Sequence, residues 1–147
     1  MLISIYREED KEYSDLLRQH IRDFNDLLSP YLEMGREDGF TKHYNLEVKD
    51  GETFIGGLTS RIFWNLMEID NVFIQKDFRH KGHGKKLLDM AIAFAKEENL
   101  NFIILQTFSF EAAEFYKKMG FFVVGEIENY PPGSSKYTLR YELKNSK

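Results

Sequence analysis

The 147-residue chain contains no cysteine, and this absence removes several kinds of site at once. Without thiols there can be no disulfide, no thiolate nucleophile and no cysteine-based zinc site. A chain without cysteine suits a reducing compartment, so we expect a cytoplasmic protein.

Long apolar runs are also missing. No stretch of about 18 apolar residues occurs, so the sequence predicts no membrane-spanning helix and no membrane partner. The first residues, Met1–Tyr6, have neither the basic leader nor the apolar length of a signal peptide. Charged residues make up 30% of the chain, as in ordinary soluble proteins, and the length suffices for one domain with a real core. We therefore expect a single domain over residues 1–147.

Basic residues are outnumbered by acidic ones, 20 against 24, but they are concentrated in one place. The formal net charge is −4, whereas one short segment holds five basic residues: Lys76, Arg79, Lys81, Lys85 and Lys86. Nucleic-acid-binding proteins are usually basic over a broad face, so we expect no nucleic-acid partner. A local basic cluster on an acidic protein predicts a small polyanion, such as a nucleotide or cofactor phosphate.

Hydrophobic periodicity predicts a mixed α/β (α+β) chain. We expect helices over residues 12–28, from 84 to near 99, and 111–119, the last with Ser109 as its N-cap. The segment 31–40 is a loop or one more short helix. The expected strands are 2–7, 43–49, 53–61, 66–74, 102–107, 121–126 and 137–143, with a hairpin turn at Asp50-Gly51. Gly56-Gly57 inside a strand indicates a bulge or a close backbone approach.

The basic segment itself reads as a strand, a glycine-rich turn and a helix N-terminus. Gly82 and Gly84 lie within it, and free N–H groups at such a helix end bind phosphate well. Taken alone, a Gly-x-Gly pair indicates a tight turn equally well. A Walker loop is excluded by its spacing, and a dinucleotide-binding loop would need a third glycine where Leu87 stands.

Two motifs in this order resemble the GNAT superfamily of N-acetyltransferases. Arg79–Gly84 reads Arg-x-x-Gly-x-Gly, and Ala112–Phe121 resembles the family's Ala-x-x-Phe-Tyr-x-x-x-Gly-Phe signature. The chain departs from the family at Ser109, where many members carry Asn, and at His83, where a small or aliphatic residue is commoner. The backbone of the phosphate loop does not depend on either side chain.

This resemblance implies a GNAT-like fold: a central, twisted, mostly antiparallel sheet of about six or seven strands, with one splayed parallel pair and flanking helices. It also implies acetyl-CoA as the donor, no metal, and direct acetyl transfer to a primary amine of a small-molecule or peptide acceptor. Family members are often dimers, so a homodimer is a further expectation. The identity of the acceptor stays open.

The resemblance also assigns site residues. It implies that the backbone from His80 to Lys85 wraps a pyrophosphate and that the preceding strand pairs with pantetheine. The residues expected to bind the cofactor are Val72, Phe73, Ile74, Arg79, His80, Lys81, Gly82, His83, Gly84, Lys85, Ser109 and Tyr116. His80 and His83 lack a third ligand at a suitable spacing, so we expect no metal site.

Catalysis requires a proton donor for the leaving thiolate and a base for the amine. Tyr116 occupies the position of the family's tyrosine near the sulfur and is the candidate acid; the alternative is a core tyrosine beside Phe115. Glu68 and Asp70 are the candidate bases, because alternate strand residues share one face. The alternative is that both lie at a solvated strand end.

Two other functions compete with an acetyltransferase. A non-catalytic CoA-binding or regulatory module would use the same loop, but the intact Tyr116 argues against it. A small nucleic-acid-binding domain would use the basic cluster, but the net negative charge and the lack of aromatic residues among the lysines argue against that.

Overall fold

The computed structural model describes residues 1–144. The chain divides into two compact units, the first ending at Phe40 and the second beginning at Thr41. The first unit contains the helices α1 (Lys11–Asp26) and α2 (Pro30–Met34). The Asp10 carboxylate caps α1 by accepting a hydrogen bond of 2.9 Å from the Tyr13 amide. An ion pair of 2.5 Å between Arg36 and Asp26 supports the turn between the helices. The expectation of one domain over the whole chain stays a prediction.

The strand predicted over residues 2–7 is wrong. Residues 1–10 have no helix or strand. A strand needs a neighbour for its backbone hydrogen bonds, and the unit that ends at Phe40 contains only helices. The predicted helix over 12–28 is confirmed as α1, which ends two residues earlier, and α2 confirms the short helix weighed for 31–40.

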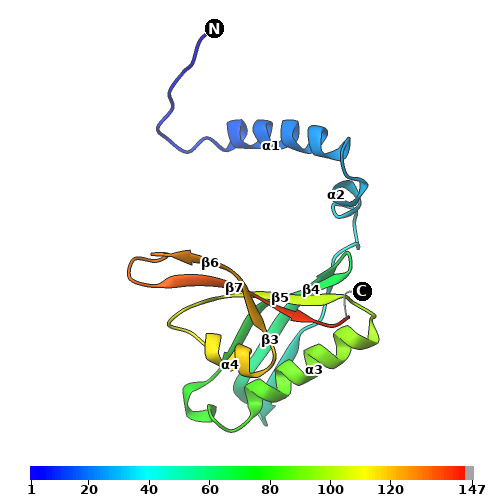
Figure 1. Cartoon of the computed structure of the whole chain (residues 1–147), viewed down its shortest axis with the longest axis vertical. Coiled ribbons are helices and arrows are strands. Elements are labelled where there is room, and N and C mark those ends of the chain that lie inside the picture. The colour runs from blue at the N-terminus through cyan, green and yellow to red at the C-terminus, as the bar shows by residue number, and fades with distance from the viewer. Residues whose placement is uncertain (145–147) are drawn as a thin grey trace. The chain divides into compact units, whose positions relative to one another are not determined.

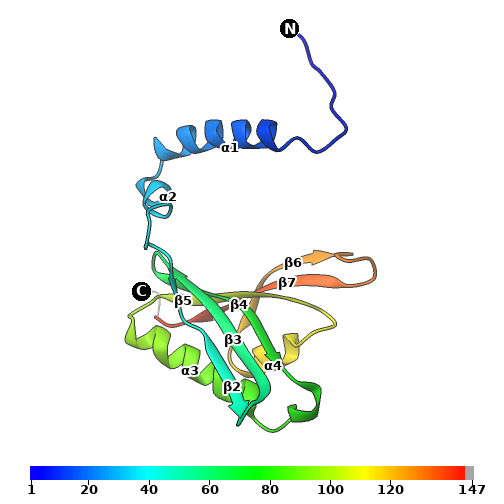
Figure 2. The same ribbon diagram turned by 180° about the vertical axis from the view of Figure 1, so that it is seen from behind.

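The second unit is built on a seven-stranded sheet (Figures 1 and 2). Its strands follow the order β1-β3-β4-β5-β7-β6, with β2 also paired to β3. Every pairing is antiparallel except that of β4 with β5. The expected mixed fold with one parallel pair is therefore confirmed. The elements are β1 (Lys42–His43), β2 (Leu46–Asp50), β3 (Thr53–Phe63), β4 (Leu66–Ile74), the 3-10 helix η1 (Lys76–Phe78), α3 (His83–Glu97), β5 (Phe102–Phe108), α4 (Ala113–Lys118), β6 (Phe122–Glu128) and β7 (Ser135–Glu142).

Helices α3 and α4 lie on the same side of this sheet in both views (Figures 1 and 2). One apolar stripe of α3 forms the core with the sheet, because its members recur at helical spacing. The buried α3 residues are Leu87, Leu88, Ala91, Ile92 and Ala95. They join fully buried sheet residues such as Met67, Ile103 and Leu139. Burying each large apolar side chain contributes roughly 1.5–3 kcal/mol, so this layer anchors the N-terminal end of α3.

Strands β4 and β5 separate part-way along their length. Their parallel pairing ends at Ile69 and Leu105. Beyond that point β4 still pairs with β3, and β5 still pairs with β7. The break coincides with a bulge against β3, because Thr59 pairs with Asn71 whereas Ser60 pairs with Ile69. Asp70 is thus the extra residue, and a bulge of this kind bends its strand. The splayed parallel pair implied by the family resemblance is present.

None of the helices in residues 1–144 is long and apolar enough to span a membrane.

The two glycines inside β3 mark close backbone contacts, as predicted. A Cβ atom built on Gly56 would lie 2.2 Å from the carbonyl oxygen of Phe73, and one on Gly57 would lie 2.6 Å from that of Leu46. Backbone atoms cannot move aside cheaply, so only glycine fits here. Gly56 in particular keeps β3 against the end of β4, which borders the candidate site.

The variant Gly56→Ala should destabilise the fold by about 2 kcal/mol or more, because its methyl group would overlap a strand carbonyl. Gly125→Ala in β6 is the matched control, since its Cβ would meet only the Thr138 side chain, at 3.9 Å. Urea unfolding of both variants measures the difference. Equal stability of the two variants would contradict the close contact.

Candidate active site

A hollow of about 670 Å³ in the second unit, called the larger hollow below, lies where β4, the loop after it, α3 and the start of α4 come together. It is lined by Val72, Phe73, Ile74, Phe78, Arg79, His80, Gly82, His83, Gly84, Lys85, Phe110, Glu111, Ala112, Phe115 and Tyr116. Every residue predicted to bind the cofactor is in this lining except Lys81 and Ser109. Segments that are far apart in the sequence therefore form one surface.

The N-terminus of α3 presents unpaired amides to the larger hollow. Gly82 is the N-cap residue with a φ of 88°, a conformation that favours glycine, and no side chain caps the helix. The first helical hydrogen bond runs from the Lys86 amide to the Gly82 carbonyl, so the amides of His83, Gly84 and Lys85 have no intrahelical partner. These N–H groups and the helix dipole suit an anion such as a pyrophosphate.

Gly84 leaves room beside these amides. It has no positive φ, and a Cβ atom there would meet only the Phe115 ring at 3.5 Å and the Ile74 side chain. The protein itself would therefore accept a methyl group at this position. The space that glycine keeps open belongs to the larger hollow, which fits a bound phosphate chain.

Two basic residues hold the loop in place. Arg79 Nε donates a hydrogen bond of 2.8 Å to the Ile74 carbonyl, and its guanidinium lies 5.7 Å from the centre of the Phe73 ring. The Lys81 ammonium lies 5.4 Å from the centre of the Phe78 ring. Arg79 thus fixes the loop against the end of β4 while it also lines the larger hollow, whereas Lys81 contacts the loop only.

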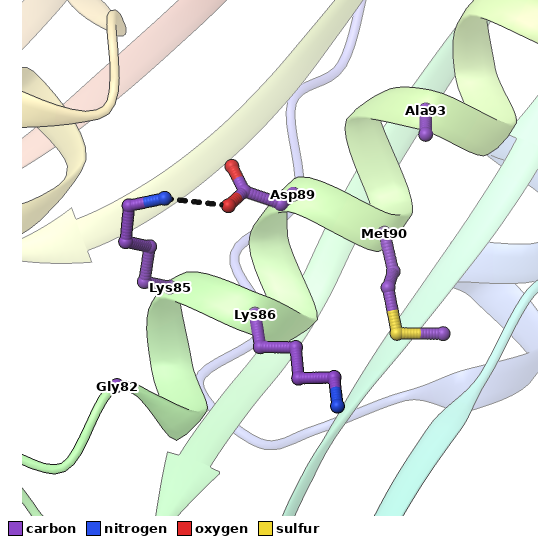
Figure 3. A pocket seen from close by; sticks show the side chains of 6 residues that line it. All are labelled: Gly82, Lys85, Lys86, Asp89, Met90 and Ala93. Atoms are coloured by element: carbon purple, nitrogen blue, oxygen red, sulfur yellow. Dashed lines mark hydrogen bonds and ion pairs between the residues drawn. The ribbon is translucent and has the colours of Figure 1, made fainter.

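A second basic surface continues along α3 (Figure 3). This surface contains a hollow of about 360 Å³, whose lining is Gly82, Lys85, Lys86, Asp89, Met90 and Ala93. Gly82 and Lys85 also line the larger hollow. Lys85 pairs with Asp89 at 2.7 Å. Within residues 1–144, no carboxylate pairs with Lys86, so its positive charge stays available next to the loop.

A third hollow of about 270 Å³, called the smaller hollow below, occupies the gap where β4 and β5 separate. Its lining consists of Ile69, Asp70, Asn71, Val72, Phe73, Leu105, Gln106, Thr107, Glu111 and Tyr116. Val72, Phe73, Glu111 and Tyr116 line both hollows. The smaller and larger hollows therefore meet at these four residues, which is where groups held in the two could react.

Tyr116 projects from α4 into this junction. Its side chain is 7% exposed and its ring packs against those of Phe115 and Phe121. Burial, together with the negative charge of Glu111, raises the pKa of Tyr116 to about 12. The hydroxyl therefore keeps its proton at neutral pH. The ring belongs to the core and the side chain also lines the site, while the role of Tyr116 as the acid stays a prediction.

Arg61 binds both predicted base carboxylates. Its Nε and Nη2 atoms donate to Asp70 Oδ2 and Oδ1, each at 2.8 Å, and Nη2 also donates to Glu68 Oε2. The hydrogen bond to Asp70 is the main cause that raises the pKa of Arg61. Asp70 lines the smaller hollow, whereas Glu68 lines neither hollow. Both carboxylates are therefore held by one cation, but Asp70 is still exposed, so the role of either residue as the base stays a prediction.

Sequence reasoning missed Arg61, although a signal was present. The residues Trp64-Asn65 form a two-residue turn between β3 and β4, and counting back from it pairs Arg61 with Glu68. Oppositely charged residues at such cross-strand positions attract each other. The contact with Asp70 could not be counted in this way, because the bulge shifts the register.

Ser109 does not cap a helix, contrary to the prediction. Helix α4 begins at Ala113 with Ala112 as its N-cap. Ser109 instead exchanges hydrogen bonds with Ser135 of β7: its amide donates to the Ser135 carbonyl, and its hydroxyl accepts from the Ser135 amide at 3.0 Å. The Ser109 hydroxyl therefore accepts a hydrogen bond from a residue 26 positions away instead of from the first turn of the helix. Ser109 lies outside the lining of the larger hollow.

Comparison with known proteins decides what this site belongs to. Residues 2–121 match the family model of the Acetyltransferase (GNAT) family. This chain belongs to the GNAT family. It is 31% identical over 127 residues to the blasticidin-S acetyltransferase of Streptomyces morookaense, covering 81% of this chain and 93% of that one. It is also 35% identical over 77 residues to streptothricin acetyltransferase A of Bacillus subtilis (strain 168), covering 50% of this chain and 44% of that one.

Solved structures agree with this membership. An acetyltransferase from Bacillus cereus ATCC 14579 superimposes with a TM-score of 0.76 at 26% identity, covering 95% of this chain and 97% of that one. A protein assigned as a streptothricin acetyltransferase from Bacillus anthracis str. Ames, in complex with acetyl coenzyme A, has the same fold, with a TM-score of 0.59 at 24% identity over 76% and 67% of the two chains. This GNAT protein is accordingly an acetyltransferase with acetyl-CoA as its donor.

Ionisation of Tyr116 should weaken the fold in alkali. Its folded-state pKa lies above the ordinary value, so its stabilising contribution is complete below about pH 10 and is lost as the pH rises towards 12. Between about pH 8 and pH 11, wild type should lose about 1 kcal/mol more than Tyr116→Phe in urea unfolding. The variant of an exposed tyrosine, Tyr130→Phe, should behave like wild type. Equal losses in wild type and Tyr116→Phe would contradict the shift.

Proposed function

We propose that this acetyltransferase acts on a primary amine of a small molecule, and that the junction at Tyr116 is where transfer occurs. The observation that carries the proposal is the meeting of two hollows at one buried tyrosine. One hollow offers free amides for an anionic donor, and the other is small and lined by both polar and apolar side chains. The names of the relatives, which acetylate blasticidin-S and streptothricin, support a small-molecule acceptor over a peptide.

The donor half of the site follows from the larger hollow. Acetyl-CoA supplies an activated thioester when it is bound. The amides of His83, Gly84 and Lys85 are suited to its pyrophosphate, and Lys86 to its remaining phosphate. The edge of β4 at Val72 and Phe73 has lost its β5 partner, so its backbone groups are open to pairing with an extended chain of amides.

At the junction, the protein offers a proton and hydrogen-bond donors. We assign Tyr116 as the acid that gives its proton to the leaving sulfur, which its position in the lining of both hollows supports. Backbone N–H groups near Phe73 and Ile74 are the candidate donors for the acyl oxygen as it gains charge. Lys81 and Ser109 do not line the larger hollow, so their contact with the donor stays a prediction without support from this lining.

Two finer expectations stay predictions: a cytoplasmic location and a homodimer. An apolar surface on β6, the edge strand of the sheet, supports the second. The exposed residues there are Phe122, Val123, Val124 and Ile127. An exposed edge with apolar side chains is a surface on which a second copy can pair.

Filling the space at Gly84 should abolish donor binding. In Gly84→Leu the side chain would extend from a Cβ atom that already touches Phe115, into the larger hollow. We expect isothermal titration calorimetry with acetyl-CoA to give no measurable heat, with thermal unfolding confirming that the variant is folded. Wild-type affinity in Gly84→Leu would refute the placement of the donor.

Loss of the Tyr116 hydroxyl should slow transfer without weakening donor binding. We expect wild type to release free thiol from acetyl-CoA with at least one member of a panel of small amines. Tyr116→Phe should lower kcat by about 10²-fold or more, the usual contribution of a positioned acid, at an unchanged Kd for acetyl-CoA. Thiol release at wild-type rate would exclude the acid role, and a panel without any thiol release would exclude the proposed function.

A further inference from the structure

The smaller hollow has two carboxylates in its lining, and their surroundings differ. Asp70 receives hydrogen bonds from Arg61 on both of its oxygens, each at 2.8 Å. Each of its oxygens therefore accepts a charge-assisted hydrogen bond, although the same guanidinium also binds Glu68. A residue bound in this way is poorly placed to receive a proton from an incoming amine.

Glu111 is the other carboxylate, and no cation balances it. Within residues 1–144, no Lys, Arg or His nitrogen lies within 4.0 Å of its carboxylate. The side chain is nevertheless held in place, because Oε1 accepts a hydrogen bond of 3.1 Å from the Phe108 amide. The Glu111 amide in turn donates to the Phe108 carbonyl, so backbone and side chain fix the same turn.

Glu111 also stands at the right place for the reaction. It lines both hollows, as Tyr116 does, and its charge acts on the Tyr116 hydroxyl. A negative charge at the junction attracts a cation that enters the smaller hollow. The proton donor for the leaving group and a proton acceptor for the attacking group are thus contributed by α4 and by the turn just before it.

We propose that Glu111 binds the acceptor as a primary ammonium ion and takes its proton, so that this acetyltransferase selects small cationic amines. The proposal rests on the function proposed above. It replaces Glu68 and Asp70 as the base with a residue from the segment that leads into α4.

The proposed acetyl transfer from the thioester to the amine conserves atoms and charge. The ammonium gives one proton to a Glu111 oxygen and becomes a neutral amine. The amine lone pair forms the new C–N bond to the acetyl carbon, the C–S bond breaks, and its electron pair leaves with the sulfur, which takes the Tyr116 proton. The remaining surplus proton on nitrogen restores Tyr116, and Glu111 releases its proton to solvent. The products are an acetamide, a free thiol and one proton.

The experiment compares Glu111→Gln with Glu114→Gln. The glutamine side chain of Glu111→Gln would keep an oxygen that can accept from the Phe108 amide, so the turn should persist. Glu114 lies on α4, pairs with Lys117 and lines neither hollow, which makes it a matched control. Thiol release is measured with ethylamine, 2-fluoroethylamine and 2,2,2-trifluoroethylamine, a series of similar size whose last member is largely uncharged at neutral pH.

We expect Glu111→Gln to lower kcat/KM for ethylamine by about 10²-fold and to lose progressively less along the series, because an uncharged amine needs no base. The Kd for acetyl-CoA, from calorimetry, should stay at the wild-type value in both variants. Wild-type rates in Glu111→Gln, or an equal loss with all three amines, would overturn the proposal. Wild type that releases no thiol with any amine would instead overturn the proposed function itself.

Discussion

The site exists because two neighbouring parallel strands stop pairing. Beyond Ile69 and Leu105, β4 follows β3 while β5 follows β7, and the extra residue Asp70 in β4 accompanies the change. Lost backbone pairing inside a sheet would normally cost stability, since unpaired N–H and C=O groups need partners. Here the open edges border a hollow into which a ligand with its own amides can fit. The fold thus leaves a gap in its sheet, and this gap is where we propose that the reaction takes place.

Positive and negative charges lie at opposite ends of this gap. The loop before α3 and the first turn of that helix bring positive charge and free amides to one end, while Asp70 and Glu111 bring carboxylates to the other. Arg61 pairs with Asp70 and also with Glu68, whereas no basic side chain in residues 1–144 pairs with Glu111. An anionic donor and a cationic acceptor would each be drawn to its own end, with Tyr116 between them.

Local patterns were reliable where a residue's neighbours in sequence are also its neighbours in space. The glycine-rich turn before α3 is such a case, because a left-handed Gly82 followed by a helix is a local arrangement. The helical periodicity of α1 and α3 is another. The pattern misled at residues 2–7, where a β-type sequence has no strand to pair with, and at Ser109, whose hydroxyl is bound to Ser135. In both cases the deciding partner was distant or absent.

The sequence by itself determined the family, the mixed fold and the glycine-rich turn before α3, since these rest on motif spacing and on periods of two and 3.6 residues. Only the tertiary structure decided how the carboxylates divide. Arg61 reaches Asp70 across a bulge whose register no spacing rule gives, and Glu111 borders the smaller hollow only because the turn before α4 lies beside the separated strands. Which carboxylate stays free depends on which cation the fold places within reach, and that is a property of three-dimensional packing alone.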